Sequence, residues 1–507
     1  MSATGATLAW KGPLPSMQEA LTAPYRYRGD LLRFCLAALI VLSISRIHQR
    51  YTFLSMLRPG LVLTGVSIAV ALLKPQVLAD ASWTRRWPAR LVFCLTVVSI
   101  SSIAFGISQG GAWWFFSNYY WKVLVTGLLL MAAVRNERDL WFFVWAHVVG
   151  VAILAFMALF VFQMVAEGNG ITRLSNLDTW DANDVCVLML ISLPLCLLLL
   201  RTSTAKGKFV AGVVLIAIGA VIARSGSRGG FLGLSAVLFA YLGSMKGQAK
   251  VRGIAMVVMV AIGLSLAAPS GYWKQMSTIT SVKEDYNWDA AQGRRQLAIR
   301  GIGYMMSYPF FGVGIGNFGR AEGTISLIAG QKGVRWSAPH NSFVQAGAEL
   351  GVPGFVLFLA MILGCIIAPW RLRRRIPDSW ESGTWEQRFL SQLAIYLPLS
   401  AIGFAAPAYF VSFAYLDPIY MLVAITAGLI AAVERQIRVS PDGNRQSSEG
   451  SPRALRGVTP PQRRARPNPP IYWAPAPIEL RRSVATAEPA TVLLIAGHKA
   501  SQCSVST

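Results

Sequence analysis

The stretch DVCVLMLISLPLCLLLL at Asp184–Leu200 carries a single charged residue, at its first position. A helix that crosses the hydrocarbon core of a bilayer needs about 20 mostly apolar residues, because lipid cannot satisfy free backbone groups. Similar segments before and after it predict an all-α, polytopic integral membrane protein with about 12 transmembrane helices. The expected spans are Leu31–Ser45, Met56–Leu73, Leu91–Ile107, Tyr119–Val134, Leu140–Val165, Asp184–Leu200, Phe209–Ala223, Gly229–Ser244, Gly253–Ala268, Pro353–Trp370, Phe389–Ala406 and Tyr415–Val433.

The composition of the whole chain agrees with this class. Of the 507 residues, 54% are hydrophobic and 14% are charged, the mean hydropathy is +0.48 and the formal net charge is +24. A soluble protein has roughly 25% charged residues, and a nucleic-acid binder this basic would be poor in apolar residues. The sequence therefore excludes both classes, and we expect no nucleic-acid partner.

The distribution of Lys and Arg predicts the orientation, because basic loops stay in the cytoplasm. Five loops, around residues 74–90, 135–138, 201–208, 246–252 and 371–375, hold such clusters, and alternate connections are poor in charge. One loop disagrees, because Arg46, Arg50 and Arg58 would lie outside. Either the first span is short and lies at the interface, which leaves eleven true spans, or these arginines have a function.

The chain divides into three parts. Residues 1–30 form a predicted cytoplasmic segment without an apolar h-region, so we expect no cleaved signal peptide. Residues 31–433 form the membrane domain, with a periplasmic loop at about 269–351 that is long enough to be functional. Residues 434–507 are basic and Pro-rich and predict a disordered cytoplasmic tail. Both termini would then be cytoplasmic, in a multi-pass protein of the bacterial inner membrane.

The string Arg224-Ser225-Gly226-Ser227-Arg228-Gly229-Gly230 joins two apolar spans at the predicted outer face. Charge at this boundary opposes the orientation rule and suggests a function. Arg224 and Arg228 could offer guanidinium groups to an anion such as pyrophosphate. The alternative is a tight polar turn whose arginines snorkel to the interface.

Two further strings lie in the predicted periplasmic loop. His340, followed by Asn341 and Ser342, is the one histidine of that loop, and it could act as a general base or bind phosphate. Arg294 and Arg295 could face either solvent or an anionic ligand. Gly314, Gly316 and Gly319 spell G-x-G-x-x-G, but no βαβ unit surrounds them, so a Gly-rich turn is the better interpretation.

Acidic residues gather before the span at Asp184–Leu200. Asp178, Asp181 and Asp184 could bind a divalent cation, or Asp181 or Asn183 could cap the helix that follows. Arg173, just upstream, is a further candidate anion ligand. The cysteines form no C-x-x-C pair, and we expect neither a metal site nor a cofactor.

Three of these strings resemble the motifs of the bacterial O-antigen ligase and polymerase superfamily. The pair His340-Asn341 with Gly351-x-x-Gly354 resembles H-[NSQ]-x9-G-x-x-G, Ser225–Gly229 resembles T/S-G-S-R-G, and Pro309–Phe318 resembles P-x-x-G-x-G-x-x-x-F. Where many members read N-P-N-x-x-A, this chain has Asp181–Cys186.

The resemblance implies a metal-independent glycosyltransferase of the GT-C type. It would transfer a glycan from undecaprenyl pyrophosphate to an acceptor hydroxyl at the periplasmic face, with the lipid bilayer around it. Arg228, Arg224, Arg173 and Arg295 would bind the pyrophosphate, His340 would activate the hydroxyl or bind phosphate, and Asn341 would orient the imidazole.

Three functions remain open from the sequence. A ligase would use lipid A-core or a related acceptor, and a polymerase would join lipid-linked repeats of O-antigen or exopolysaccharide. A chain-length regulator and a flippase are further partners to consider. The third function is transport of an anionic substrate, although no internal repeat or mid-span charge favours it.

Overall fold

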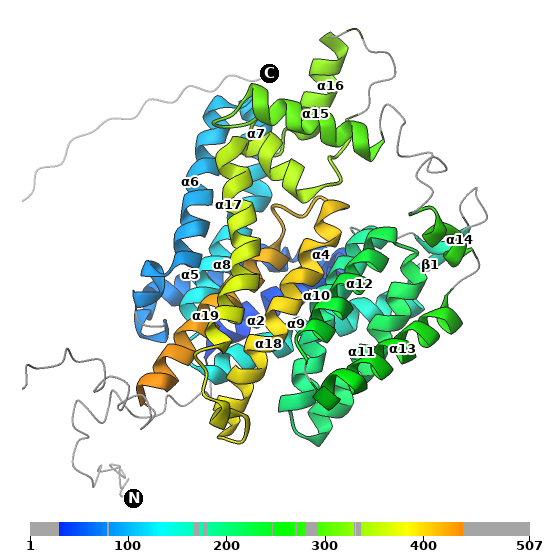
Figure 1. Ribbon diagram of the computed structural model, residues 1–507. Helices are drawn as coiled ribbons and strands as arrows, with labels where there is room; N and C mark the ends of the chain where they lie inside the picture. The colour runs from blue at the N-terminus through cyan, green and yellow to red at the C-terminus, as the bar shows by residue number, and fades with distance from the viewer. Residues whose placement is uncertain are drawn as a thin grey trace, which may run out of the picture. The chain divides into compact units, whose positions relative to one another are not determined.

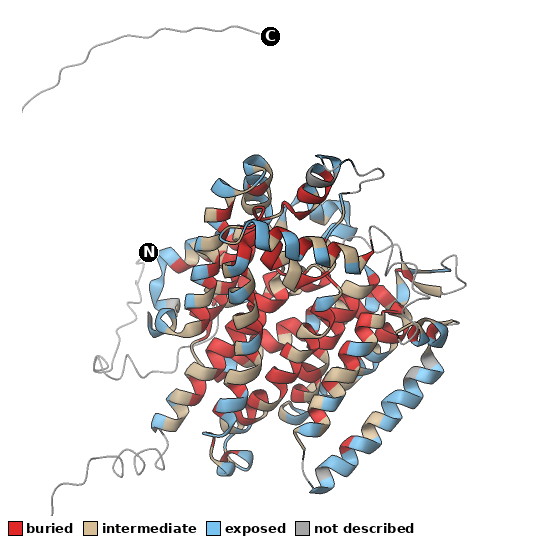
Figure 2. Ribbon diagram, turned by 45° about the horizontal axis from the view of Figure 1, so that its top comes forward, coloured by how far each residue is buried: buried red, intermediate tan, exposed pale blue. Residues whose placement is uncertain are grey.

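The fold is a bundle of helices, and α10 (Ala182–Thr202) is one of the two most deeply buried of the long apolar helices in the described residues. The computed structural model describes residues 30–78, 81–166, 172–175, 180–245, 247–268, 271–279, 293–328, 330 and 336–439. Helix α10 begins with a capping box, in which the Asp181 side chain accepts from the Asp184 N–H and the Asp184 side chain accepts from the Asp181 N–H. Helices α9, α11, α12 and α18 pack around it. Figure 2 shows buried residues concentrated in the middle of the bundle.

The chain runs through helices joined mostly by short connections, and Figure 1 shows their arrangement. The other helices are α2 (Leu31–Ser45), α3 (Ile47–Arg50), α4 (Thr52–Met56), α5 (Pro59–Leu73), α6 (Trp87–Phe105), α7 (Gln109–Phe115), α8 (Trp121–Ala133), α9 (Glu137–Phe160), α11 (Ala205–Ser225), α12 (Arg228–Gly243), α13 (Gly247–Ala267), α14 (Tyr272–Ser277), α15 (Arg294–Ser307), α16 (Phe318–Ile328), α17 (Ser342–Arg373), α18 (Trp385–Ala405) and α19 (Asp417–Val439). One antiparallel hairpin pairs β1 (Gln163–Ala166) with β2 (Thr172–Ser175).

Every predicted span coincides with a helix, so the all-α, polytopic class is confirmed. Within the described residues, eight helices are long and apolar enough to cross a membrane. They are Thr52–Leu73, Trp87–Phe105, Glu137–Phe160, Ala182–Thr202, Ala205–Ser225, Ser342–Arg373, Trp385–Tyr409 and Asp417–Arg438. Helices α2 and α12 are apolar but shorter. The number of twelve crossings stays a prediction.

The predicted cytoplasmic loops meet at one end of the bundle. Arg86 pairs with Glu434 at 2.8 Å, and Arg138 lies 3.6 Å from Glu386. The indole N–H of Trp385 donates to a carbonyl at the end of α10. Loops distant in sequence therefore share one end, which we call the inner end, and we call the opposite end the outer end. Which side of the membrane each end faces stays a prediction.

Most boundaries differ from the predicted ones by a few residues, and three of the differences bear on the site or on the predicted tail. Helix α17 begins at Ser342 rather than Pro353 and continues through Gly351, whose φ of 72° and ψ of −169° break the helix locally. Residues 163–166 form a strand rather than the end of a span. Helix α19 continues to Val439, beyond the predicted limit at residue 433. Of the predicted segments 1–30 and 434–507, only Asp30 and the end of α19 belong to the described residues.

The region predicted as a loop at 269–351 contains helices of its own. Its described residues form α14, α15, α16 and the first turns of α17, and α15 packs against α17. In Figure 1, α15 lies across one end of α17, and α16 lies beside it. This layer of helices carries His340 and Arg294 to the outer end of the bundle.

Candidate functional site

The turn Ser225–Gly229 joins α11 to α12 at the outer end. Gly226 adopts the left-handed conformation, with φ 59°, and ends α11. Ser227 caps α12, because its Oγ accepts from the Gly230 N–H at 3.0 Å. The same Oγ donates to Asn183 Oδ1 at 2.8 Å. The turn is therefore fixed to the first turn of α10.

The glycines that follow Arg228 let α12 approach its neighbours closely. A Cβ atom on Gly230 would lie 2.1 Å from Cys186 Sγ, and one on Gly229 would lie 2.8 Å from the ring of Phe410. No side chain fits at either position unless these neighbours move. The close packing fixes the direction in which α12 and its first residue, Arg228, leave the turn.

Two of the predicted arginine ligands surround this turn, and a third does not. The Cβ of Arg173, on β2, lies 3.3 Å from the position that a Cβ on Gly226 would occupy. The Arg228 Nη1 donates to Thr278 Oγ1 at 3.0 Å. Arg224 instead donates to the carbonyl of Leu159, at the end of α9. This bond favours the snorkelling, structural interpretation for Arg224.

His340 is held in an unusual backbone conformation just before α17. Its φ of 45° lies in the left-handed region, which residues other than Gly rarely adopt and which often marks functional positions. Burial lowers the pKa of its imidazole below the usual 6.5, and the positive charge of Arg294 lowers it further, while Asp181 acts in the opposite direction. The ring is therefore mostly neutral at pH 7 and can accept a proton.

Asn341 has a structural role in addition to the predicted one. It caps α17, and its Oδ1 accepts from the N–H groups of Phe343 at 3.0 Å and Val344 at 3.1 Å. The next residue, Ser342, donates to the carbonyl of Val411 at 2.7 Å. Asn341 and Ser342 thus fix the chain on the C-terminal side of His340, and the proposed orientation of the imidazole by Asn341 stays a prediction.

The first turn of α10 links the two halves of the site. The charge of Asp181 acts on His340, and Asn183 holds Ser227, which is adjacent to Arg228. Helices α10, α12, α15 and α17 all begin in this region. Their N-terminal N–H groups and dipoles favour negative charge, so the arrangement suits an anionic ligand.

Arg294 and Arg295, although adjacent in α15, differ in their exposure and in their neighbours. Arg294 is half-buried and its charge acts on His340, whereas Arg295 is exposed. The sequence did not distinguish between the two. Of the two, Arg294 is the one whose charge lowers the pKa of His340, and the binding of pyrophosphate by Arg295 stays a prediction.

The glycine-rich segment Pro309–Phe318 forms a turn against the break in α17, as predicted. The carboxylate of the buried Glu349 accepts from the N–H groups of Gly316 at 2.8 Å and Phe318 at 3.0 Å. Gly312 has φ 63°, and a Cβ there would lie 2.3 Å from the backbone of Glu349. Glu349 was not among the predicted residues, although a carboxylate within an apolar helix was the available signal.

We expect Gly312→Ala to lower the free energy of unfolding by about 1–3 kcal/mol, as overpacking does, because the new methyl group meets backbone atoms that cannot rotate away. Thermal unfolding in detergent would measure the change. Gly303→Ala is the matched control, since nothing lies within 4 Å of its Cβ position in α15. Equal unfolding temperatures for the two variants would contradict this account of the turn.

The acidic residues near α10 act as helix caps. The Asp181 Oδ1 accepts from the N–H groups of Asn183 at 2.6 Å and Asp184 at 2.8 Å. Among the described residues, no three His, Cys, Asp or Glu side chains are grouped closely enough to hold a metal ion. Asp178 lies outside them. The capping interpretation of Asp181 is confirmed, and the independence of the reaction from metal ions stays a prediction.

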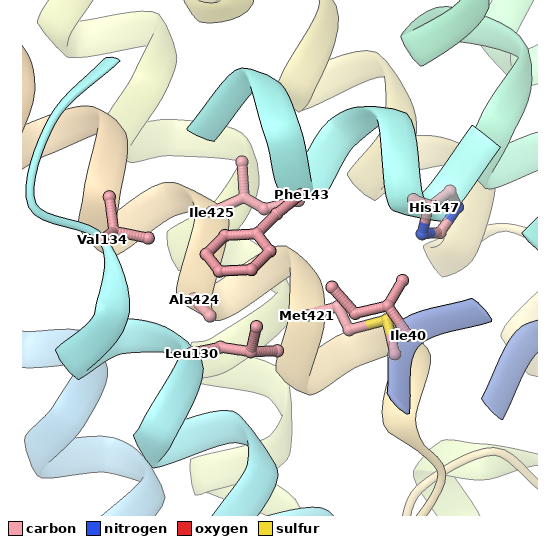
Figure 3. Close-up of a pocket in the computed structure, with 8 residues that line it drawn as sticks. All are labelled: Ile40, Leu130, Val134, Phe143, His147, Met421, Ala424 and Ile425. Atoms are coloured by element: carbon pink, nitrogen blue, oxygen red, sulfur yellow. The ribbon is translucent and has the colours of Figure 1, made fainter. Parts of the chain in front are cut away.

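A small cavity lies away from this site, in the core between α2, α8, α9 and α19 (Figure 3). It measures about 10 Å³ and is lined by Ile40, Leu130, Val134, Phe143, His147, Met421, Ala424 and Ile425. The His147 Nε2 lies 2.9 Å from Ser192 Oγ, so this histidine has a structural role between α9 and α10. The cavity is too small for a glycan or a lipid chain.

The comparison with known families covers the central part of the chain. Residues 212–359 match the model of the family described as O-antigen ligase. This segment includes Arg224, Arg228, Arg294, Arg295 and His340, whereas Arg173 precedes it. No curated protein matches the sequence.

Proposed function

We propose, from the match of residues 212–359 to the O-antigen ligase family, that the protein transfers a glycan from undecaprenyl pyrophosphate to an acceptor hydroxyl. The family implies a membrane enzyme that acts on lipid-linked glycans. We place the reaction at the outer end of the bundle, facing the periplasm, with both termini in the cytoplasm. We propose that the transfer needs no metal ion.

The observation that carries the proposal is that the start of α10 connects the neutral imidazole of His340 to the cationic turn before Arg228. The first turn of α10 contacts the turn before Arg228, and its Asp181 acts on His340. A base and an anion-binding turn on a common support are what glycan transfer from a pyrophosphate requires.

The chemistry follows from these two groups. The imidazole of His340 takes the proton of the acceptor hydroxyl while the acceptor oxygen forms a bond to the anomeric carbon of the donor. The bond from that carbon to the pyrophosphate oxygen breaks, and the electron pair leaves with the pyrophosphate. Arg228, with Arg173 beside the turn, stabilises the negative charge that develops there. The proton then passes from the imidazole to water.

The ligase reaction is the first form of the proposal, with lipid A-core as the acceptor. Deletion of the protein followed by analysis of lipid-linked intermediates tests it. Long glycan chains stranded on undecaprenyl pyrophosphate support a ligase, and single repeats indicate the polymerase instead. An unaltered glycan profile contradicts both. The family match supports these enzyme hypotheses over transport of an anion.

The pH dependence of transfer should follow His340. A general base must be neutral, so kcat/KM falls as the pH drops through the lowered pKa of this imidazole. Arg294→Gln removes one cause of that lowering, so the pKa rises and the acid limb of the profile moves to higher pH.

A pH profile of kcat/KM in proteoliposomes measures this shift. Arg295→Gln is the matched control, because the charge of Arg295 is not among those that act on His340. Its acid limb should coincide with that of the wild type, whatever its effect on donor binding. Coincident limbs for Arg294→Gln and the wild type would contradict the role of His340 as the base.

A further inference from the structure

A second group of cations lies at the outer end of the bundle, away from the turn at Arg228. Arg46 follows α2, Arg58 precedes α5 and Lys122 lies in the first turn of α8. Helices α2, α5 and α8 pack against one another, α19 packs against α2 and α8, and these residues lie at the outer ends of their helices. The arginines are two of those that oppose the orientation rule, so their position asks for a physical reason.

The geometry of Arg46 shows how the cluster is built. Its Nη2 lies 3.7 Å from Asp417 Oδ2, and its guanidinium carbon lies 5.0 Å from the ring centre of Trp180. The Nε of Arg46 is buried and has no hydrogen-bond partner among the described residues. One nitrogen of this guanidinium is therefore left unsatisfied by the described part of the protein.

Positive charge exceeds negative charge in this group. Arg46 pairs with Asp417, and Arg58 and Lys122 lie at the ends of helices that pack against α2, so three cations are grouped with one carboxylate. Arg46 and Arg58 both adopt positive φ, 51° and 43°, which costs free energy at residues other than Gly. Strained backbone and grouped cations both lower the stability of the fold, and such unfavourable features are typical of ligand-binding sites.

The surroundings indicate a lipid rather than a soluble anion. The short helix α4 lies between the two arginines in the chain, and its Phe53 and Met56 are 72% and 78% exposed. Exposed apolar side chains beside cations match a phosphorylated lipid, whose charge lies at the interface while its chains enter the hydrocarbon.

The cluster also adjoins the proposed base. Arg46 lies over the ring of Trp180, and the next residue, Asp181, acts on His340. A lipid held by Arg46 would therefore lie against the residue that precedes the helix cap Asp181.

We propose that Arg46, Arg58 and Lys122 bind the phosphate of the lipid that accepts the glycan. This proposal rests on the proposed function and extends it to the acceptor. The shared chemistry is a phosphorylated lipid, either lipid A-core or a second undecaprenyl-pyrophosphate-linked glycan.

Native mass spectrometry of the full chain in nanodiscs tests the site without relying on transfer. The probes are lipid A-core, an undecaprenyl-pyrophosphate-linked glycan, their dephosphorylated forms and phosphatidylglycerol. We expect Arg58→Gln and Lys122→Gln each to weaken binding of one phosphorylated acceptor by about 10- to 30-fold, the usual loss of a charge-assisted contact. Binding of its dephosphorylated form should not change.

The matched control is Arg138→Gln, at the inner end, where the arginine side chain is 65% exposed. In a transfer assay, the two cluster variants should raise KM for the acceptor by the same factor and leave KM for the donor unchanged. Wild-type binding of the acceptor by both variants overturns the proposal. Equal competition by phosphatidylglycerol overturns it as well, since the site would then hold bulk phospholipid. An inactive wild type with phosphate-dependent acceptor binding refutes the proposed function alone.

Discussion

His340→Ala is expected to lower kcat for glycan transfer by about 10²–10⁴-fold, the usual contribution of a general base. The reason is local, since the neutral, half-buried imidazole is the proposed proton acceptor at the site. The measurement is single-turnover transfer in proteoliposomes that contain purified protein, a lipid-linked donor and an acceptor. If His340 instead bound phosphate, the loss would appear mainly in KM for the donor.

The backbone at His340 calls for a second variant. Because φ is 45°, Ala could perturb the turn as well as remove the base. His340→Asn avoids this, since Asn tolerates the left-handed region but cannot act as a base at neutral pH. Both variants should lose activity to a similar extent, and His498→Ala, in the predicted tail, should keep wild-type activity. Full activity of His340→Asn would exclude the base role.

Arg228→Gln is expected to lower kcat by about 10²–10³-fold, as the loss of one preorganised donor to a developing negative charge does. Arg228 is the first residue of α12, and close packing at Gly229 and Gly230 fixes the course of that helix. Its bond to Thr278 holds one nitrogen in place. The side chain is thus oriented before the donor binds.

Two further variants sharpen this test. Arg228→Lys keeps the charge but loses the planar fork, so it should retain part of the activity. Arg320→Gln is the matched control, because Arg320 is an exposed arginine at the same end, bonded to Ser108 Oγ at 3.1 Å. Wild-type rates for Arg228→Gln, with unchanged thermal unfolding, would remove Arg228 from the site.

The helices were predictable because their signal is local. The span Leu31–Ser45 agrees residue by residue with α2, and the capping role of Asp181 followed from its place before an apolar run. The early start of α17 was missed because Gly351 and Pro353 normally end a helix. Here the Gly-rich turn packs against the break in α17, and the Val352 N–H donates to the carbonyl of Pro309.

The site was only partly predictable. The sequence predicted a base and several arginines, and the contacts that distinguish these residues come from partners distant in sequence. Arg224 contacts the end of α9, Arg294 rather than Arg295 acts on His340, and Asn341 caps α17. No local pattern encodes these contacts, because each joins segments that meet only after the helices pack.

The sequence by itself determined the class of the protein. Hydrophobic segments of sufficient length must become helices in lipid, since each helix satisfies its own backbone groups. The tertiary structure alone decided which charged side chains meet. Arg46, Lys122 and Asp417 come from three helices, and Arg173, Arg228 and Thr278 gather around one turn. Electrostatic interactions depend on distance in space rather than along the chain, so only the packed bundle assembles the residues of the proposed donor site and of the proposed acceptor site.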